Sequence, residues 1–283
     1  APDSARLIIN GLDFGLTPQK IFGIPTGKYR VELLRSNYAA LQKDINIKSN
    51  EVVNLNEALT LSKVVLLEHF ANTRCLPCPL ADSLIAELAE EYGPVRLITL
   101  GYHTNFPGPD DPMYLSSPAG NEQRRRYYKP NIIPTVVVDG IKVPDYRYKE
   151  LYENLINQQL QVQPSAVIRF FTPTREDSAV YGMAQVKALS DLSGDIRVYC
   201  VLIENHIEFS AYNGQDHFDD IFRAFYPDEN GLPLNLAAGE KTVIPYNFQL
   251  KGDWGRDLTV ICFLQNNTTK SIIQAATTRY PDL

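Results

Sequence analysis

The sequence has no long hydrophobic run and no strongly basic stretch. None of its apolar segments approaches the ~20 residues that a membrane-spanning helix requires, so we expect no transmembrane helix. The longest basic run is Arg124–Arg126, and the formal net charge is −6 at pH 7. Binding of nucleic acid needs a clustered basic face, so we expect no nucleic acid among the partners.

Cysteine is also scarce. The 283 residues contain four cysteines, at positions 75, 78, 200 and 262, too few for a disulfide scaffold in a chain of this length. One close pair and two isolated cysteines indicate a redox motif and two buried residues. The length suits two or three domains, and the content of 44% hydrophobic residues is that of globular proteins. The chain begins at Ala1 without a methionine, as expected of an exported protein after removal of its targeting segment, or of a trimmed chain.

Short alternating runs separated by turn signals predict a small β-sandwich at residues 1–58. The expected strands are 6–9, 28–34, 43–47 and 52–55. The stretches 11–18 (GLDFGLTP) and 24–32 (IPTGKYRVE), followed by Tyr38, resemble the PEGA repeat domain. This resemblance implies a small all-β module of the cell surface or envelope without chemistry of its own.

Residues 60–162 have the pattern of an α/β domain with a mixed sheet. The continuous apolar run 63–70 predicts a strand buried on both faces. Apolar residues at three- and four-residue spacing then predict a helix over 78–92. Further expected elements are strands at 95–102 and 133–140 and helices at 121–128 and 148–160, with an insert rich in Pro, Gly and Asp at 104–111.

Residues 163–283 predict a β-sandwich domain. The expected strands are 166–171, 180–189, 196–203, 241–250, 258–265 and 272–278. Residues 205–240 show little strand pattern, and we expect a loop excursion there. The predicted fold class is therefore multidomain, with a central α/β domain flanked by a small N-terminal and a C-terminal β-sandwich.

Cys75 and Cys78 follow the buried strand and stand at the start of the helix. A helix N-terminus presents free N–H groups and a partial positive charge, which favour the thiolate, and Arg74 can add to that charge. We expect Cys75 to attack a partner disulfide and Cys78 to resolve the mixed disulfide. The order strand, Cys pair, helix resembles the thioredoxin superfamily, which identifies residues 60–162 as thioredoxin-like.

Other uses of the Cys pair stay open. A structural zinc site needs further ligands, but no second such pair exists and the four histidines, at 69, 103, 206 and 217, are scattered, so we expect no metal. A static structural disulfide is the stronger alternative. Cys200 and Cys262 are in phase with inward-pointing neighbours, so we expect buried free thiols, with an inter-strand disulfide as the alternative.

Further residues are candidate parts of the same site. Ile133-Pro134 at a strand entry resembles the cis-proline element of the superfamily, which implies that it holds a substrate strand together with the loop at Arg74. Thioredoxins also place an acid in the strand before the motif, and a buried acid can relay a proton to the resolving cysteine. Glu68 takes this position only if the following loop has one extra residue; otherwise His69 takes it. His103 is either a site residue or an ordinary loop histidine.

Two longer stretches resemble the bacterial outer-membrane-protein-twenty-eight-related family. They are 65–79 (VLLEHFANTRCLPCP) and 216–224 (DHFDDIFRA). The resemblance implies a cell-envelope protein, often a lipoprotein, in which a thioredoxin-like domain precedes a β-sandwich. The chain departs from the family at Arg74, where an aromatic residue is usual, and at residues 70–72, where Phe-Ala-Asn replaces Phe-Thr-Gly.

These observations predict an exported thiol–disulfide oxidoreductase of the cell envelope, periplasmic or outer-membrane, that acts on protein cysteines without a cofactor. Its partners would be protein thiols and disulfides and a redox partner protein, and a lipid anchor outside this chain would tether it to the membrane. One alternative is a surface module that binds protein or glycan, with a structural Cys75–Cys78 disulfide. Another is an assembly component of the cell surface.

Overall fold

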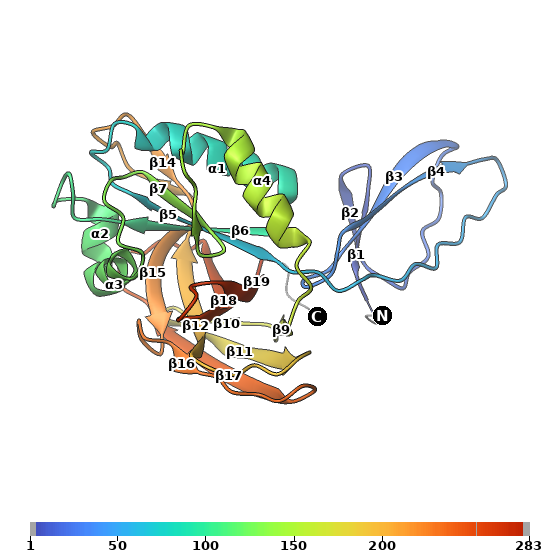
Figure 1. The fold of residues 1–283 in the computed structure, drawn as a ribbon. Helices are drawn as coiled ribbons and strands as arrows, with labels where there is room; N and C mark the ends of the chain where they lie inside the picture. The colour runs from blue at the N-terminus through green and yellow to red at the C-terminus, as the bar shows by residue number, and fades with distance from the viewer. Residues whose placement is uncertain (1–3, 253, 280–283) are drawn as a thin grey trace.

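The computed structural model describes residues 4–252 and 254–279, which form four helices and nineteen strands. The N-terminal residue Ala1, on which the expectation of a processed terminus rests, lies outside these residues. The first strands form a small sheet at one end of the molecule, and the remaining elements surround a large mixed sheet (Figure 1). None of the described helices is long and apolar enough to cross a membrane.

The N-terminal part is one antiparallel sheet with the strand order β2-β1-β3-β4. Its strands are β1 (Arg6–Ile9), β2 (Leu12–Leu16), β3 (Gly27–Leu34) and β4 (Leu41–Ile47). Asn10 and Gly11 join β1 to β2 with positive φ angles of 48° and 79°, as a two-residue hairpin turn requires. Residues 48–58 form no strand, and Val52 is 81% exposed. This part is therefore a single sheet and not the expected sandwich.

The large sheet has nine strands in the order β19-β18-β12-β15-β6-β5-β7-β8, with β16 beside β12. The strands up to residue 142 are β5 (Val65–Ala71), β6 (Leu97–His103), β7 (Thr135–Val138) and β8 (Ile141–Lys142). The later ones are β12 (Ile196–Glu204), β15 (Ile221–Tyr226), β16 (Leu232–Pro233), β18 (Leu258–Asn266) and β19 (Ile272–Thr277). β5 is parallel to β6, antiparallel to β7 and buried along its whole length, as its apolar run predicts.

Helices cover both faces of this sheet around β5. They are α1 (Cys78–Tyr92), α2 (Pro112–Ser116), α3 (Pro118–Tyr128) and α4 (Lys149–Leu160). Val65 and Leu67 of β5 share a core with α1 and α4, whereas Leu66 and Phe70 share a core with α3. α1 has the predicted bounds because Pro79 fits its first turn and Gly93 ends it at a φ of 67°.

A second, smaller sheet packs against the C-terminal end of the large one. It has the order β10-β11-β17, with β9 beside β11. Its strands are β9 (Ala166–Phe170), β10 (Thr174–Arg175), β11 (Ala179–Ala188) and β17 (Lys241–Gln249). Cys200 of β12 and Cys262 of β18 face each other in register within this core and are buried free thiols, as expected.

The expected division at residue 163 does not hold, because the segments on either side share one sheet and one core. Phe70 and Tyr102 pack in the same cluster as Tyr199 and Phe263. The junction is β15, which pairs with β6 on one side and β12 on the other. β15 lies in the expected loop excursion, which also contains the short pair β13 (Ile207–Glu208) and β14 (His217–Phe218).

Candidate functional site

Cys75 and Cys78 form a disulfide at the start of α1. The loop from β5 to α1 is held in a tight turn, because the Cys75 amide donates to the Asn72 carbonyl at 2.9 Å and the Cys78 amide donates to the Cys75 carbonyl at 3.2 Å. Leu76, between the two cysteines, is 71% exposed, whereas Cys75 is 3% exposed and Cys78 is fully buried. The disulfide therefore lies just beneath the surface, on the Cys75 side.

A loop from the C-terminal half contacts this segment. We call residues 209–216, between β13 and β14, the cover loop. The Asn213 amide nitrogen Nδ2 donates to the Cys75 carbonyl at 3.2 Å, and the Asn213 backbone N–H donates to the Thr73 carbonyl at 3.0 Å. The guanidinium carbon of Arg74 lies 5.3 Å from the centre of the Tyr212 ring. These contacts hold the cover loop against the backbone of Cys75.

Ile133, next to Pro134, packs against the Cys pair. The Ile133–Pro134 bond is cis, Pro134 is buried, and Ile133 is half-buried against Ala71, Cys75 and Cys78. The structure thus packs Ile133 on the Cys pair, with the cis bond to Pro134 directly after it. Their role in holding a substrate strand stays a prediction.

Glu68 faces away from the Cys pair, so the expectation that it relays a proton to Cys78 does not hold. Side chains alternate between the two faces of β5, and Glu68 points toward α3. Its carboxylate accepts two hydrogen bonds from Arg124, from Nε at 2.6 Å and from Nη2 at 2.8 Å. It also accepts one from the Tyr128 hydroxyl at 2.6 Å. All three side chains are buried. Burial opposes the charge of Arg124, but the Glu68 carboxylate outweighs it and holds the pKa of Arg124 well above its ordinary value. This pair is an internal structural contact.

His69 occupies the face of β5 that Glu68 does not. The imidazole Nδ1 lies 3.2 Å from Oδ1 of Asp82, which stands on α1 one turn after Cys78. Neither of these two atoms has a well-directed hydrogen bond. Burial alone would raise the pKa of Asp82, but the contact with His69 outweighs it and the pKa lies below its ordinary value.

Residues on β6 and on the cover loop contact His69 and Asp82. Gly101 of β6 is opposite His69, and a Cβ there would lie 2.6 Å from His69 Nε2, so the glycine makes room for the ring. Gln215 of the cover loop donates from Nε2 to Asp82 Oδ2 at 2.8 Å. His69, and not Glu68, therefore lies on the face of β5 that α1 covers, and the cover loop contacts its partner Asp82.

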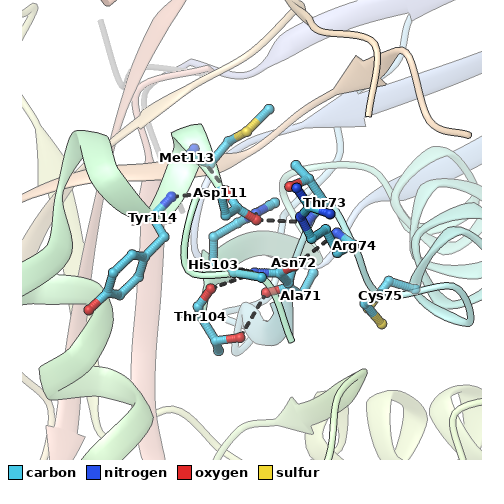
Figure 2. Close-up of polar contacts among 12 residues, drawn as sticks. Ala71, Asn72, Thr73, Arg74, Cys75, His103, Thr104, Asp111, Met113 and Tyr114 are labelled. Atoms are coloured by element: carbon cyan, nitrogen blue, oxygen red, sulfur yellow. Dashed lines mark hydrogen bonds and ion pairs between the residues drawn. A yellow bond between two sulfur atoms is a disulfide. The ribbon is translucent and has the colours of Figure 1, made fainter. Parts of the chain in front are cut away.

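The insert at 104–111 clamps the loop that precedes the Cys pair (Figure 2). Asn72 Nδ2 donates to the carbonyls of Thr104, at 2.7 Å, and Gly108, at 2.8 Å. Arg74 pairs with Asp110 through Nε, at 2.9 Å, and Nη2, at 2.6 Å. Arg74, predicted as a substrate contact, thus links the insert to the cover loop.

His103 and Asp111 form the buried centre of the clamp. His103 Nδ1 lies 2.8 Å from Asp111 Oδ2, which also accepts from the Thr73 amide at 2.7 Å. The other oxygen of Asp111 accepts from the first amides of α2. Burial would raise the pKa of Asp111, but the charge of His103 outweighs it and the pKa lies below its ordinary value. His103 is thus a buried support of the site loop rather than an ordinary loop histidine (Figure 2).

Sequence reasoning missed three residues that contact the site, Asp82, Asn213 and Gln215. A signal existed for Asp82, because it follows Cys78 by four residues in a predicted helix and so lies on the same face. No local signal exists for Asn213 or Gln215. They reach the site only because β15 joins the two halves of the sheet.

Comparisons with known proteins bear on the fold of the chain. HBP35 of Porphyromonas gingivalis superposes with a TM-score of 0.65 at 18% identity, over 79% of this chain and 76% of that one, so the two share a fold. A domain of the outer membrane lipoprotein Omp28 from Porphyromonas gingivalis aligns at 11% identity over 40% of this chain and 86% of that one, with a TM-score of 0.29. No curated protein matches the chain. Residues 1–63 match the family model of the PEGA domain.

Proposed function

We propose that the protein is a thiol–disulfide oxidoreductase that acts on protein cysteines through Cys75 and Cys78. The observation that carries this proposal is the placement of the disulfide. It lies at the first residue of α1, with Ile133 packed on it and the exposed Leu76 between its cysteines.

The topology around the pair supports a thioredoxin-like domain. The order of elements is β5, α1, β6, then β7, β8 and α4, and the strands lie side by side as β6-β5-β7-β8. β5 and β6 are parallel, whereas β7 and β8 form an antiparallel hairpin. The order of elements agrees with the one expected of a thioredoxin-like domain, with α3 as the expected helix between β6 and β7 and α2 added before it.

The exchange proceeds in two balanced steps. In the reduced protein the Cys75 thiolate attacks a partner disulfide, forms a mixed disulfide and releases one partner thiolate. The Cys78 thiolate then attacks the Cys75 sulfur, which restores the Cys75–Cys78 disulfide and releases the second partner thiolate. Two electrons pass to the partner, and a redox partner protein with a dithiol returns them. Oxidation of a partner is the reverse sequence.

His69 and Asp82 supply the proton chemistry of the second step. Cys78 is fully buried and must lose its proton before it can attack. The His69 imidazole faces the same side of β5 as Ala71, which packs on the Cys pair, and can take that proton. The Asp82 carboxylate stabilises the imidazolium that results.

The cell envelope is the proposed location. The PEGA match at residues 1–63 supports it, as does the resemblance of 65–79 and 216–224 to a family of envelope proteins that are often lipoproteins. The tether would be a lipid anchor outside this chain. Partners would be proteins that form or exchange disulfides in that compartment.

One observation favours a second function, a surface binding module with a structural disulfide. Cys75 is only 3% exposed and the cover loop is bonded to its carbonyl, so a partner sulfur reaches it only after the loop moves. In this case the Cys75–Cys78 bond would staple the start of α1 and would not turn over.

A trapping experiment separates the two functions. The Cys78→Ser variant leaves Cys75 as the remaining thiol of the Cys pair, and it should accumulate mixed disulfides with a disulfide-containing protein substrate. The Cys75→Ser variant is the matched control. Cys200 and Cys262 should not interfere, because both are buried and because hydrogen bonding to Cys200, with burial, raises the pKa of Cys262 well above its ordinary value. A Cys78→Ser variant that traps no partner, together with a disulfide that resists mild reductants, would favour the structural staple.

A further inference from the structure

Two histidines that are far apart from the Cys pair in sequence meet at the foot of the β13–β14 hairpin. His206 precedes β13, and His217 lies on β14, where it is directly opposite Glu208. Asp219 follows β14. One ligand atom from each of His206, His217 and Asp219 lies within 4.8 Å of those of the other two, and all three side chains are exposed. Pairing of the two short strands creates this cluster, which residue spacing alone does not reveal.

Two of the three ligand side chains already contact each other. His217 Nε2 lies 3.0 Å from Asp219 Oδ2, so a bound ion would replace this contact with two bonds to the metal. His206 Nδ1 lies 2.5 Å from Oδ2 of Asp257, so the other ring nitrogen of His206 stays available. A carboxylate on the far nitrogen is the usual partner of a metal-binding histidine, because it fixes the tautomer and the ring orientation. The His206 amide donates to Asp219 Oδ1 at 2.8 Å, which holds that carboxylate beside His217.

The ligand set selects the class of metal. Two imidazoles and one carboxylate suit zinc and its first-row neighbours, whereas calcium and magnesium require sites made almost wholly of oxygen. Bonds of about 2.0–2.2 Å in a tetrahedral zinc site place the ligand atoms about 3.3–3.6 Å apart. The three ligand atoms already lie within 4.8 Å of one another, and because the side chains are exposed, small rotations can bring the atoms to that spacing.

We propose that His206, His217 and Asp219 form a binding site for a divalent transition metal of the zinc class, with Asp257 orienting His206. Three protein ligands leave one position for water or for an external group. The ligands come from both ends of the hairpin that carries the cover loop, so the bound ion would join those ends. The site does not depend on redox activity of the Cys pair.

Zinc binding to the full chain tests this proposal. The protein is kept oxidised so that Cys75 and Cys78 offer no thiolate, and equilibrium dialysis with zinc chloride should show one saturable equivalent. His206→Ala and His217→Ala should each abolish that equivalent. Asp257→Asn should weaken binding by about 10-fold to 100-fold, since it removes only the orienting partner. Circular dichroism verifies that each variant is folded.

Asp216→Asn is the matched control. Asp216 is an exposed carboxylate of the same hairpin, outside the ligand set, so its loss removes one negative charge and should leave zinc affinity unchanged. Calcium chloride should show no saturable binding. The proposal is overturned if the oxidised wild-type protein binds no saturable zinc, or if His206→Ala and His217→Ala bind it as the wild type does, because the cluster would then hold ion pairs only.

Discussion

His69 and Asp82 lie 3.2 Å apart on the face of the sheet that carries the disulfide, one helical turn from Cys78. Both side chains are largely withdrawn from water, and Gln215 of the cover loop donates to the second oxygen of Asp82. A histidine, its carboxylate partner and a contact from the far half of the chain thus meet on the side of the sheet where α1 begins.

Replacement of His69 should slow resolution more than attack. In His69→Leu we expect the release of a mixed disulfide by Cys78 to be about 10²-fold slower, because general base catalysis contributes factors of that order. The alkylation rate of Cys75 should stay within a few-fold, because Cys75 uses no base in that reaction. Rapid-quench kinetics with a small disulfide measures the first rate and iodoacetamide the second. Equal slowing of both steps would assign His69 a purely structural role.

Replacement of Arg124, the partner of Glu68, should lower the stability of the protein and leave disulfide exchange unchanged. Arg124→Met leaves the Glu68 carboxylate buried without its bidentate partner, and removal of one member of a buried pair costs about 3–5 kcal/mol. Urea unfolding should show this loss, and the double variant Glu68→Leu/Arg124→Met should recover most of it. The rate of disulfide exchange in the folded protein should not change. If the stable double variant exchanges disulfides more slowly than the wild type, Glu68 has a role in the exchange reaction.

The sequence predicts the local surroundings of the Cys pair well. The apolar run of β5, the stripe of α1 and the proline at 134 each depend on neighbouring residues, and each lies where expected. The face of the sheet toward which Glu68 points was not predictable from neighbouring residues. Alternation shows that Glu68 and His69 point to opposite sides, but only the packing of α1 against Val65 and Leu67 decides which side holds the disulfide.

Pairing between strands far apart in the sequence explains the remaining differences between the predicted and the observed fold. β15 has a short apolar run and becomes a strand because β6 and β12 supply its hydrogen-bond partners. Without β15 the two halves would not share a sheet, and the cover loop would not reach Cys75. In contrast, β2 had a local signal, since Asn10-Gly11 is a typical hairpin turn and a strand follows it directly.

Asp139 should make stability depend on pH. It stands at the β7–β8 turn, where Oδ1 accepts from the Leu66 amide at 2.8 Å and Oδ2 lies 2.6 Å from Lys63 Nζ. This second contact is one of charge, because Oδ2 has no well-directed hydrogen bond. Burial raises the pKa of Asp139 from 3.8 to about 6, although Lys63 opposes the rise.

The raised pKa of Asp139 means that the stability of the protein falls as the pH rises. The folded state binds the proton more tightly, so the contribution of Asp139 to stability is complete below pH 3.8 and is lost as the pH rises through about 6. The loss amounts to about 3 kcal/mol. Asp139→Asn cannot ionise, so its stability relative to the wild type should increase by about this amount between about pH 4 and pH 7. A constant difference across that range, measured by urea unfolding, would contradict the raised pKa.

Asn213→Ala should expose the disulfide to reductants. The variant loses the hydrogen bond from Nδ2 to the Cys75 carbonyl but keeps the backbone bond to Thr73, so the cover loop should open more often without leaving its place. A hydrogen bond contributes about 0.5–1.5 kcal/mol, which corresponds to about a 2-fold to 10-fold faster reduction by dithiothreitol. Gln249→Ala is a suitable control, because Gln249 is exposed on β17 and its side chain donates to Asn247, far from the Cys pair in sequence. If Asn213→Ala and Gln249→Ala are reduced at the same rate, movement of the cover loop does not limit access to Cys75. The burial of that cysteine would then have to be relieved by another route, such as displacement of Ile133.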